Sequence, residues 1–512
     1  MFRVKHQKNN NQSKDLSHTP EQPKWIVLTF VLALFIGFTR AYAQTDFQLS
    51  ETNFKIPSGE SKLQLPHNQQ SDAKHMSADF YLETYNYNSA FDAARLSGNP
   101  YQENHLGLNL SYKNLEFKKL TFKSIFQTDL SKTQNSVFAL PELSQTYVLS
   151  QQDQNHDVIY VGRVTHFTND IDQRLHLGLI QPYFSQDHIN YETLGLTGAE
   201  YEKSIEQNRI YFGFYPIFLP NQDPGVTVEN GRIVAQNRWA NQAPKYFVFN
   251  DRTKEINYEI KNYKIADIVF NPAYRFGAEI PTSSVVERIS LGYKRAPLNN
   301  IVLTRETYAD LDIQGQVKLA PVVNYSNQIY SDVQLALPVG KLIYSAIYDK
   351  PDSLTAPKDQ SIQNMAALSV NSLTFELPYK NQEFEQTIYV TYAMITGGQI
   401  SDVNNDGSQN IVTVSKNRQQ YFNPVKLGAK NKFYYKLKNP VQTQVSYLFD
   451  EVQKGSLLSA DAQYSINESA QVKLGFDILG SDFSASDDQA SQYFLVKSQS
   501  FDRLFAGFSY VY

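Results

Sequence analysis

Cysteine is absent from the 512 residues of the chain. This absence excludes a disulfide scaffold and a thiolate metal site, and it suits export into an oxidising compartment. Tryptophan is scarce, with 2 residues, whereas Tyr (34) and Phe (32) are abundant and the mean hydropathy is −0.44. A polar chain rich in Tyr and Phe suits strands that show one face to lipid and the other to water.

Apolar runs long enough for a membrane helix are also lacking. Residues 25–38 (WIVLTFVLALFIGF) match the length of a signal-peptide core, and basic residues precede them. Ala41-Tyr42-Ala43 then supplies the small-x-small pattern of a signal peptidase site. We predict a signal peptide over residues 1–43 with cleavage before Gln44; an uncleaved anchor is the alternative. An exported chain without a membrane helix stays in the periplasm, leaves the cell or closes into a barrel.

The charge balance argues against a nucleic-acid partner. Residues 1–43 hold six of the 47 basic and two of the 51 acidic side chains, which leaves 41 and 49 and a net charge of −8. Nucleic-acid-binding domains are basic instead.

Apolar and polar residues alternate with period two in many segments, among them 106–113, 388–394, 441–449 and 472–478. The pattern predicts about 18 antiparallel strands, between 16 and 20. We expect an all-β, transmembrane up-and-down barrel over residues 78–512, preceded by a polar tail or plug over 44–77. Residues 255–263 and 313–325 are among the predicted strands. Long loops are expected at 165–190, 218–254, 350–365, 396–424 and 481–501; segment 296–312 breaks the alternation of short and long connections.

The chain ends in an apolar face that reaches the last residue. Leu504, Ala506, Phe508, Tyr510 and Tyr512 alternate with a second face that begins at Arg503. A final strand of this kind closes a barrel. Phe508, Tyr510 and Tyr512 are therefore expected to serve as the signal that the outer-membrane insertion machinery reads.

Two stretches resemble a known class of proteins. Residues 142–198 contain SQTYVLS, VIYVGRV, LGLIQPYF and GLTGA, and the chain end contains LGFDILG and FDRLFAGFSYVY. These patterns resemble large Gram-negative outer-membrane porins and alginate-exporter-like channels. The resemblance implies a water-filled barrel in the cell outer membrane that contacts lipid and passes small hydrophilic solutes. An export barrel or a scaffold of surface loops is the alternative, and the sequence leaves open whether the protein forms a homo-oligomer.

Catalytic and metal-binding motifs are weak. HExxH and HxH do not occur, and no GxSxG stands at a strand-to-helix turn, so we expect neither an enzyme nor a cofactor. Asp402, Asn404 and Asp406 match the first half of a calcium loop, but Thr413 stands where the bidentate Glu belongs. A plain turn is the favoured interpretation there.

Candidate pore residues follow from the loops and the alternation. A long loop that folds into the lumen would narrow it, and charges there would filter solutes. We predict this role for 218–254, with Arg163 as a comparable position at a strand end; a loop that stands in solvent, where its charges serve only hydration, is the alternative. The constriction candidates are Arg163, Arg232, Arg238, Trp239 and Arg252, and the lumen-facing candidates are Lys113, Lys473, Asp477 and Arg503.

Overall fold

The computed structural model describes most of the second of two compact units, Ser58–Tyr512. The predicted signal peptide lies outside the described residues, as does the predicted tail up to residue 74. The described residues are 75–87, 102–114, 118–129, 135–152, 155–165, 169–185, 188–189, 191–193, 195–206, 208–221, 226–235, 239, 246–249, 252–282, 285–309, 315–406, 416–434, 439–467, 469–483, 493–498 and 501–511.

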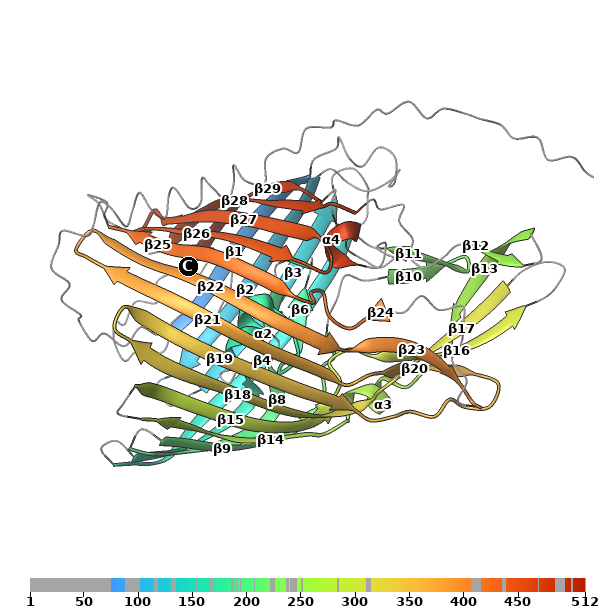
Figure 1. Ribbon diagram of the computed structural model, residues 1–512, viewed down its shortest axis with the longest axis horizontal. Coiled ribbons are helices and arrows are strands. Elements are labelled where there is room, and N and C mark those ends of the chain that lie inside the picture. Colours follow the sequence, from blue (N-terminus) through green and yellow to red (C-terminus); the bar gives the residue numbers. More distant parts are fainter. Residues whose placement is uncertain are drawn as a thin grey trace, which may run out of the picture. The chain divides into compact units, whose positions relative to one another are not determined.

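Eighteen strands form one antiparallel sheet within these residues (Figure 1). In chain order they are β1 (His75–Tyr87), β2 (Gln102–Asn114), β3 (Lys118–Asp129), β4 (Asn135–Gln152), β5 (Asn155–Val164), β8 (Leu196–Ile205), β9 (Asn208–Ile217), β14 (Ala273–Pro281), β15 (Val286–Pro297), β18 (Tyr325–Leu337), β19 (Gly340–Pro351), β21 (Leu368–Lys380), β22 (Phe384–Gly397), β25 (Pro424–Phe433), β26 (Val441–Asp450), β27 (Gly455–Ser465), β28 (Ala470–Ser481) and β29 (Arg503–Val511).

Each strand of this sheet pairs with its predecessor and its successor, and the last strand pairs with the first. Asp79 on β1 lies opposite Val511 on β29, and the register continues to Tyr87 opposite Arg503. On its other side β1 pairs with β2. The pairings therefore run all the way round, which confirms the predicted antiparallel up-and-down architecture and its strand number.

Short and long connections alternate strictly over most of the barrel. The connections after β4, β8 and β18 span only residues 153–154, 206–207 and 338–339, whereas residues 218–272 and 298–324 follow β9 and β15. β1 begins and β29 ends on the side of the short connections.

Two predicted strands, 255–263 and 313–325, were assigned wrongly to the barrel. β13 (Arg252–Ile260) and β17 (Gly315–Val322) pair in parallel with each other in a second sheet. Segment 298–324 consequently falls on the side of the long connections, and the irregularity expected at 296–312 disappears. Alternation alone could not separate these strands, because it reports a two-sided strand and not the sheet to which the strand belongs.

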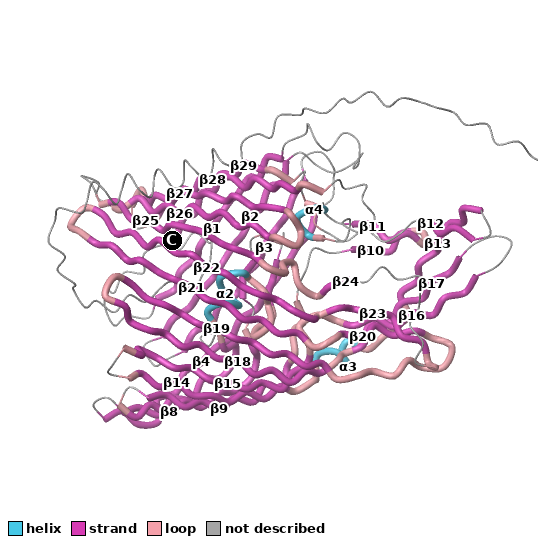
Figure 2. The backbone as a smooth tube through the Cα atoms, viewed as in Figure 1, coloured by secondary structure: helices cyan, strands magenta, loops and turns pink. Residues whose placement is uncertain are grey.

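The second sheet is assembled from four of the long connections. Its further strands are β12 (Tyr246–Phe249), β16 (Val302–Ala309), β20 (Ser361–Met365), β23 (Gln399–Asn404) and β24 (Lys416–Asn417). Figure 2 shows these strands beyond the barrel end that carries the long connections. Leu298, Val302, Ile362 and Met365 pack together in a small core at its base. Two hairpins complete the strands: β6 (Tyr183–Ser185) with β7 (Tyr191–Thr193), and β10 (Val226–Glu229) with β11 (Arg232–Ala235).

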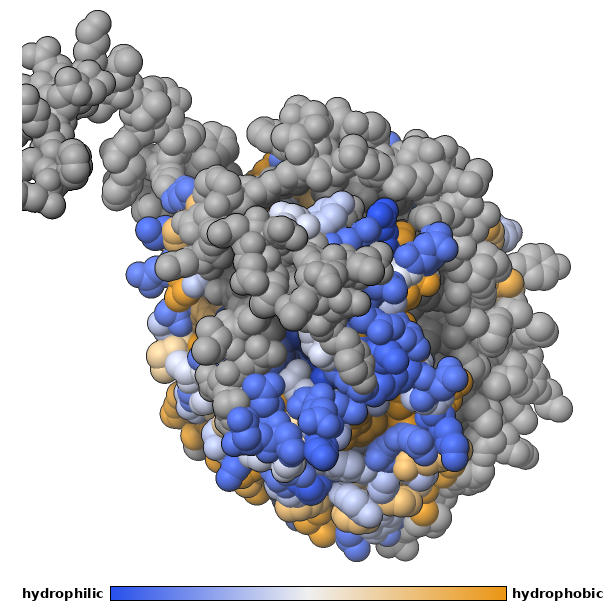
Figure 3. Space-filling view, turned by 90° about the vertical axis from the view of Figure 1, so that its right-hand side faces the viewer, coloured by the Kyte–Doolittle hydropathy of each residue, from blue (hydrophilic) through white to orange (hydrophobic). Residues whose placement is uncertain are grey.

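Burial in the barrel is inverted relative to a water-soluble protein. Along β14 and β15, Arg275 and Lys294 are fully buried, whereas the large apolar Phe276 and Leu291 are more than half exposed. The same alternation recurs on β28, where Lys473 is 2% exposed and Leu474 is 61% exposed. Figure 3 shows polar residues over the middle of the long-connection end and apolar residues along its lower margin. Such a wall has a polar interior and an apolar outer belt.

Inward aromatic rings lie over glycines of the neighbouring strand. Tyr330 lies opposite Gly292, and Tyr389 opposite Gly428. A Cβ at either glycine would meet the ring at 2.3 Å, so a larger residue there would force the ring to move. These pairs fix the register of adjacent strands.

Three short helices lie among the described residues: α2 (Asp170–Leu175), α3 (Ile265–Val269) and α4 (Phe494–Lys497). None of the helices in the described part of the chain is long and apolar enough to span a membrane.

Candidate functional site

Residues 169–183, here called the inward segment, belong to the connection between β5 and β8 and lie inside the barrel. Asn169 caps α2 through its side chain, which accepts from the Asp172 amide at 3.4 Å. The amide of Asn169 also donates to Asp332 on β18 at 2.8 Å. Ile171, Asp172 and Leu175 are buried. The N-terminus of α2 is thus tied to the barrel wall.

A tight turn after α2 is organised by the Asp172 carboxylate. One oxygen accepts from the Leu179 N–H at 2.9 Å, and the other accepts from the Ile180 N–H at 3.0 Å. Burial raises the pKa of Asp172, and these two hydrogen bonds together with the charge of Lys294 oppose that shift. His176 ends α2 at a φ of 54°. Burial and the positive charges of Lys426 and Lys430 lower the pKa of His176, so this imidazole is neutral at neutral pH.

Lysine and glutamine side chains of the wall hold the same turn from the opposite side. Lys294 on β15 donates to the carbonyl oxygens of Leu179 at 3.1 Å and Ile180 at 2.6 Å. Gln328 on β18 donates to the Leu179 oxygen at 3.0 Å. A fully buried ammonium needs acceptors of this kind, so the turn and Lys294 stabilise each other.

The charged face of α2 reaches two further strands. Arg174 pairs with Asp170 at 2.5 Å and with Glu376 on β21. Its guanidinium lies 5.4 Å from the centre of the Tyr389 ring. Lys426 on β25 donates to the Arg174 carbonyl oxygen at 2.8 Å. Cations and anions therefore meet at the surface of the inward segment.

These contacts show that the inward segment crosses the interior. It leaves the wall at β5 and returns at β8, the fifth and sixth barrel strands, but it is bonded to β15, β18, β21 and β25, the ninth, tenth, twelfth and fourteenth barrel strands. Charges on both the segment and the wall consequently face the space that remains. The inward segment therefore narrows the interior of the barrel.

A second buried cluster stiffens the wall. Arg275 on β14 pairs with Glu200 on β8, with its Nε 3.2 Å from Glu200 Oε2, and both side chains are fully buried. The Tyr215 hydroxyl donates to the same carboxylate. The Arg275 guanidinium also lies 5.3 Å from the centre of the Tyr211 ring.

The predicted constriction residues lie in different places. Arg163 donates to the Thr193 carbonyl at 2.9 Å and so braces the end of β5. Arg232 is exposed on β11 and pairs with Glu255. Trp239 is buried, with its ring 4.7 Å from that of Phe501 and 5.6 Å from the Arg503 guanidinium. Arg252 begins β13, where only its backbone is described, and Arg238 lies outside the described residues.

The lumen-facing candidates include a buried ion pair between adjacent strands. Arg503 Nε donates to Asp477 at 2.7 Å, and the Arg503 guanidinium lies 4.6 Å from the centre of the Tyr85 ring. Lys473 lies 5.0 Å from the Phe505 ring centre. Lys113 lies on β2 opposite His75, and only its backbone is described.

The described aromatic residues of the predicted insertion signal lie on the outer face of the barrel, opposite to the lumen-facing candidates. Phe508 and Tyr510 are exposed on the outer face of β29, and Tyr512 lies outside the described residues.

The calcium candidate occupies the end of the second sheet. Asp402 on β23 is buried and accepts a hydrogen bond from Arg305, while Asn404 ends that strand and Asp406 follows in an exposed turn. Among the described residues, no three His, Cys, Asp or Glu side chains gather in a way that could hold a metal ion.

Comparisons with known proteins show a distant likeness in structure. No family model matches the chain, and no curated protein matches it. Similar solved structures include OccK10 (OpdN) of Pseudomonas aeruginosa (10% identity, 86% of this chain and 99% of that chain, TM-score 0.40). OccAB4 of Acinetobacter baumannii is 11% identical over 87% of this chain and 100% of that chain, with a TM-score of 0.41. A mutant of Rh. blastica porin is 9% identical over 86% and 100%, with a TM-score of 0.32. Likenesses of this size do not establish a shared family.

The sequence predicts a long loop at 165–190, but its loop pattern alone gives no role for this segment. Asn169 before Asp170 and Asp172 is a helix-start signal, and it stands inside a loop where no helix is required. That signal could have identified α2. Nothing local indicates that Lys294 and Gln328 would meet the turn, because these contacts join residues far apart in the chain.

Proposed function

We propose that this protein is an outer-membrane channel of a Gram-negative bacterium that passes small hydrophilic solutes through a lumen narrowed by the inward segment. The observation that best supports this proposal is the inverted burial of the barrel strands. Fully buried Arg275 and Lys294 beside exposed Phe276 and Leu291 are difficult to reconcile with water on the outside. A polar interior crossed by one charged segment suits a filter.

We also propose that the protein is exported through a cleaved signal peptide, is inserted by the outer-membrane machinery and contacts lipid. As expected from the sequence, we propose no catalytic role and no cofactor. The second sheet on the long-connection side is the observation that favours the alternative of a surface-loop scaffold.

Ion conductance of the purified protein in planar bilayers tests the proposal. We expect discrete, long-lived conductance steps. A correctly folded barrel that inserts and carries no current would favour the scaffold alternative.

A charged side chain on the outer face is expected to destabilise the barrel. Leu474→Arg should destabilise the barrel by about 2–4 kcal/mol if this position lies near the middle of the bilayer. Lys473→Arg is the matched control, because it keeps a cation at the adjacent inward position. Urea unfolding of both variants in lipid vesicles, followed by far-UV circular dichroism, gives the comparison. Equal stability of the two variants would contradict a lipid-facing Leu474.

The terminal strand is expected to direct insertion. Tyr510→Ala combined with Tyr512→Ala should lower the amount of protein in outer-membrane fractions and raise the periplasmic pool, since Tyr510 is exposed on the outer face of β29 and Tyr512 continues the same alternation in the sequence. Ser509→Ala, on the inward face, is the control. N-terminal sequencing of the same fractions shows whether the mature chain begins at Gln44. Unchanged membrane levels would show that the terminal aromatics are not part of the signal.

A further inference from the structure

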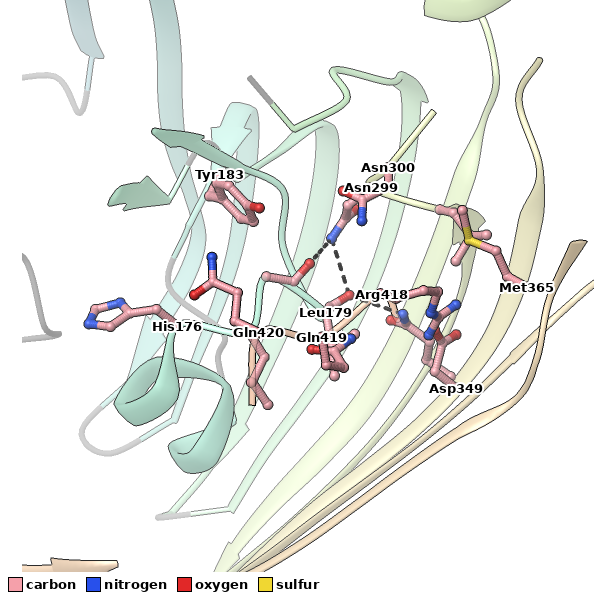
Figure 4. A pocket seen from close by; sticks show the side chains of 14 residues that line it. His176, Leu179, Tyr183, Asn299, Asn300, Asp349, Met365, Arg418, Gln419 and Gln420 are labelled. Atoms are coloured by element: carbon pink, nitrogen blue, oxygen red, sulfur yellow. Dashed lines mark hydrogen bonds and ion pairs between the residues drawn. The ribbon is translucent and has the colours of Figure 1, made fainter. Parts of the chain in front are cut away.

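A small polar cavity lies between the turn of the inward segment and the wall formed by β18 and β19 (Figure 4). Its volume is about 40 Å³, and it is partly open. Gly178 and Leu179 contribute one side, while Arg418, Gln419 and Gln420 of the β22–β25 connection contribute another. A cavity of this size admits one edge of a solute.

Buried polar atoms without hydrogen-bond partners are concentrated in this cavity. Among the described residues that line the cavity, four acceptors lack a hydrogen-bond partner: the side-chain oxygens of Gln328, Gln419 and Gln420 and one oxygen of Asp349. Two donors, Nε and Nη1 of Arg418, also remain unpaired. Leaving such atoms without partners is costly, so their concentration at one place points to a ligand.

The charge of the cavity excludes an ionic ligand as the best fit. Arg418 and Asp349 already pair with each other, and both side chains are almost completely buried. His176, the remaining titratable group of ordinary pKa near neutrality in the lining, is held neutral by burial and by Lys426 and Lys430. An anion would meet four acceptor oxygens, and a cation would meet Arg418. A zwitterion would have to break the existing ion pair.

We propose that this cavity is a binding subsite for a neutral polyhydroxylated solute, such as a sugar, inside the lumen. Hydroxyl groups both donate and accept, so adjacent hydroxyls can donate to the glutamine and aspartate oxygens while accepting from the free Arg418 donors. The inference rests on the proposed function, because it names the class of solute that the channel would hold on its way through.

Calorimetry on the purified, detergent-solubilised protein tests the subsite independently of any current. The probes are glucose, glucosamine and glucuronate, which match in ring size and differ in charge. Glucose should bind saturably. The affinity of each charged sugar should be lower than that of glucose by a factor of at least about ten, a difference of about 1.4 kcal/mol in binding free energy. Equal binding of the three sugars, or none by glucose, would overturn the inference.

Variants locate the binding. Gln420→Leu and Gln419→Leu should each weaken glucose binding about tenfold, since each removes an acceptor of the cavity. Gln386→Leu is the matched control. The side chain of Gln386 on β22 donates a hydrogen bond to Asn431 at 2.8 Å, and neither residue lines this cavity. An equal loss in all three variants would overturn the site. Heat-modifiable mobility identifies any variant that fails to fold, and the other cavity variant then decides.

Glucose added to single channels in bilayers separates the two proposals. Conductance without any glucose-dependent interruption or heat of binding overturns the subsite and leaves the channel standing. A heat of binding without conductance supports the subsite and overturns the channel.

Discussion

Replacing residues 170–182 with a short Gly-Ser linker is expected to raise single-channel conductance severalfold and to weaken ion selectivity. The inward segment crosses the interior from β5 to the wall formed by β15 to β25, and it brings Asp170 and Arg174 into the lumen. Removing it widens the narrowest part of the lumen and removes the charges nearest to a passing ion. Only near charges affect selectivity, because salt screens electrostatic interactions beyond about 8 Å. Planar-bilayer recordings at matched salt provide the measurement.

The matched control is removal of the β10–β11 hairpin, residues 226–235. This hairpin belongs to the loop 218–254, where the sequence predicts the constriction, and Arg232 on it is exposed. We expect its removal to leave conductance unchanged. If that deletion widens the channel and the other does not, the constriction belongs to 218–254.

Arg275→Met is expected to lower the free energy of unfolding by about 3–5 kcal/mol. The substitution removes the cation that compensates the charge of the Glu200 carboxylate, which is fully buried and also accepts a hydrogen bond from the Tyr215 hydroxyl. Urea unfolding in lipid vesicles, compared with the parent protein, measures the loss.

Charge balance can be distinguished from packing in the same cluster. Glu200→Gln together with Arg275→Met removes both charges, so the double variant should recover a large part of the stability that Arg275→Met loses. If the double variant is as unstable as the sum of the two single variants, the loss comes from packing of the long side chains and not from an unpaired charge.

The wall of the barrel could be predicted from the sequence because its rule is local. Leu474 and Lys473 differ in environment only because they are adjacent on a strand, and period two already records that difference. The same rule placed Arg503 and Asp477 on the inward face, where the structure pairs them at 2.7 Å.

The contacts between the barrel wall and the connections that lie inside it could not be predicted by such a local rule. Lys294 alternates correctly on its strand, but its acceptors are the carbonyl oxygens of Leu179 and Ile180, more than a hundred residues earlier in the chain. Arg418 meets Asp349 in the same way, from a connection that shows no strand pattern. Backbone carbonyls are identical at every residue, so the sequence carries no mark of which ones a buried cation will meet.

The pairing of β1 with β29 has a consequence for how the protein is made. Asp79 meets Val511, so the seam between the first and last strands joins residues from opposite ends of the barrel sequence. Bringing such distant segments together is slow, because the whole intervening chain must be arranged first. Until the ribosome has released the final strand, β1 presents an unsatisfied edge that can pair with other chains. The chain must therefore be kept apart from its own copies during translation and transit, and any truncation near its end leaves that edge permanently open.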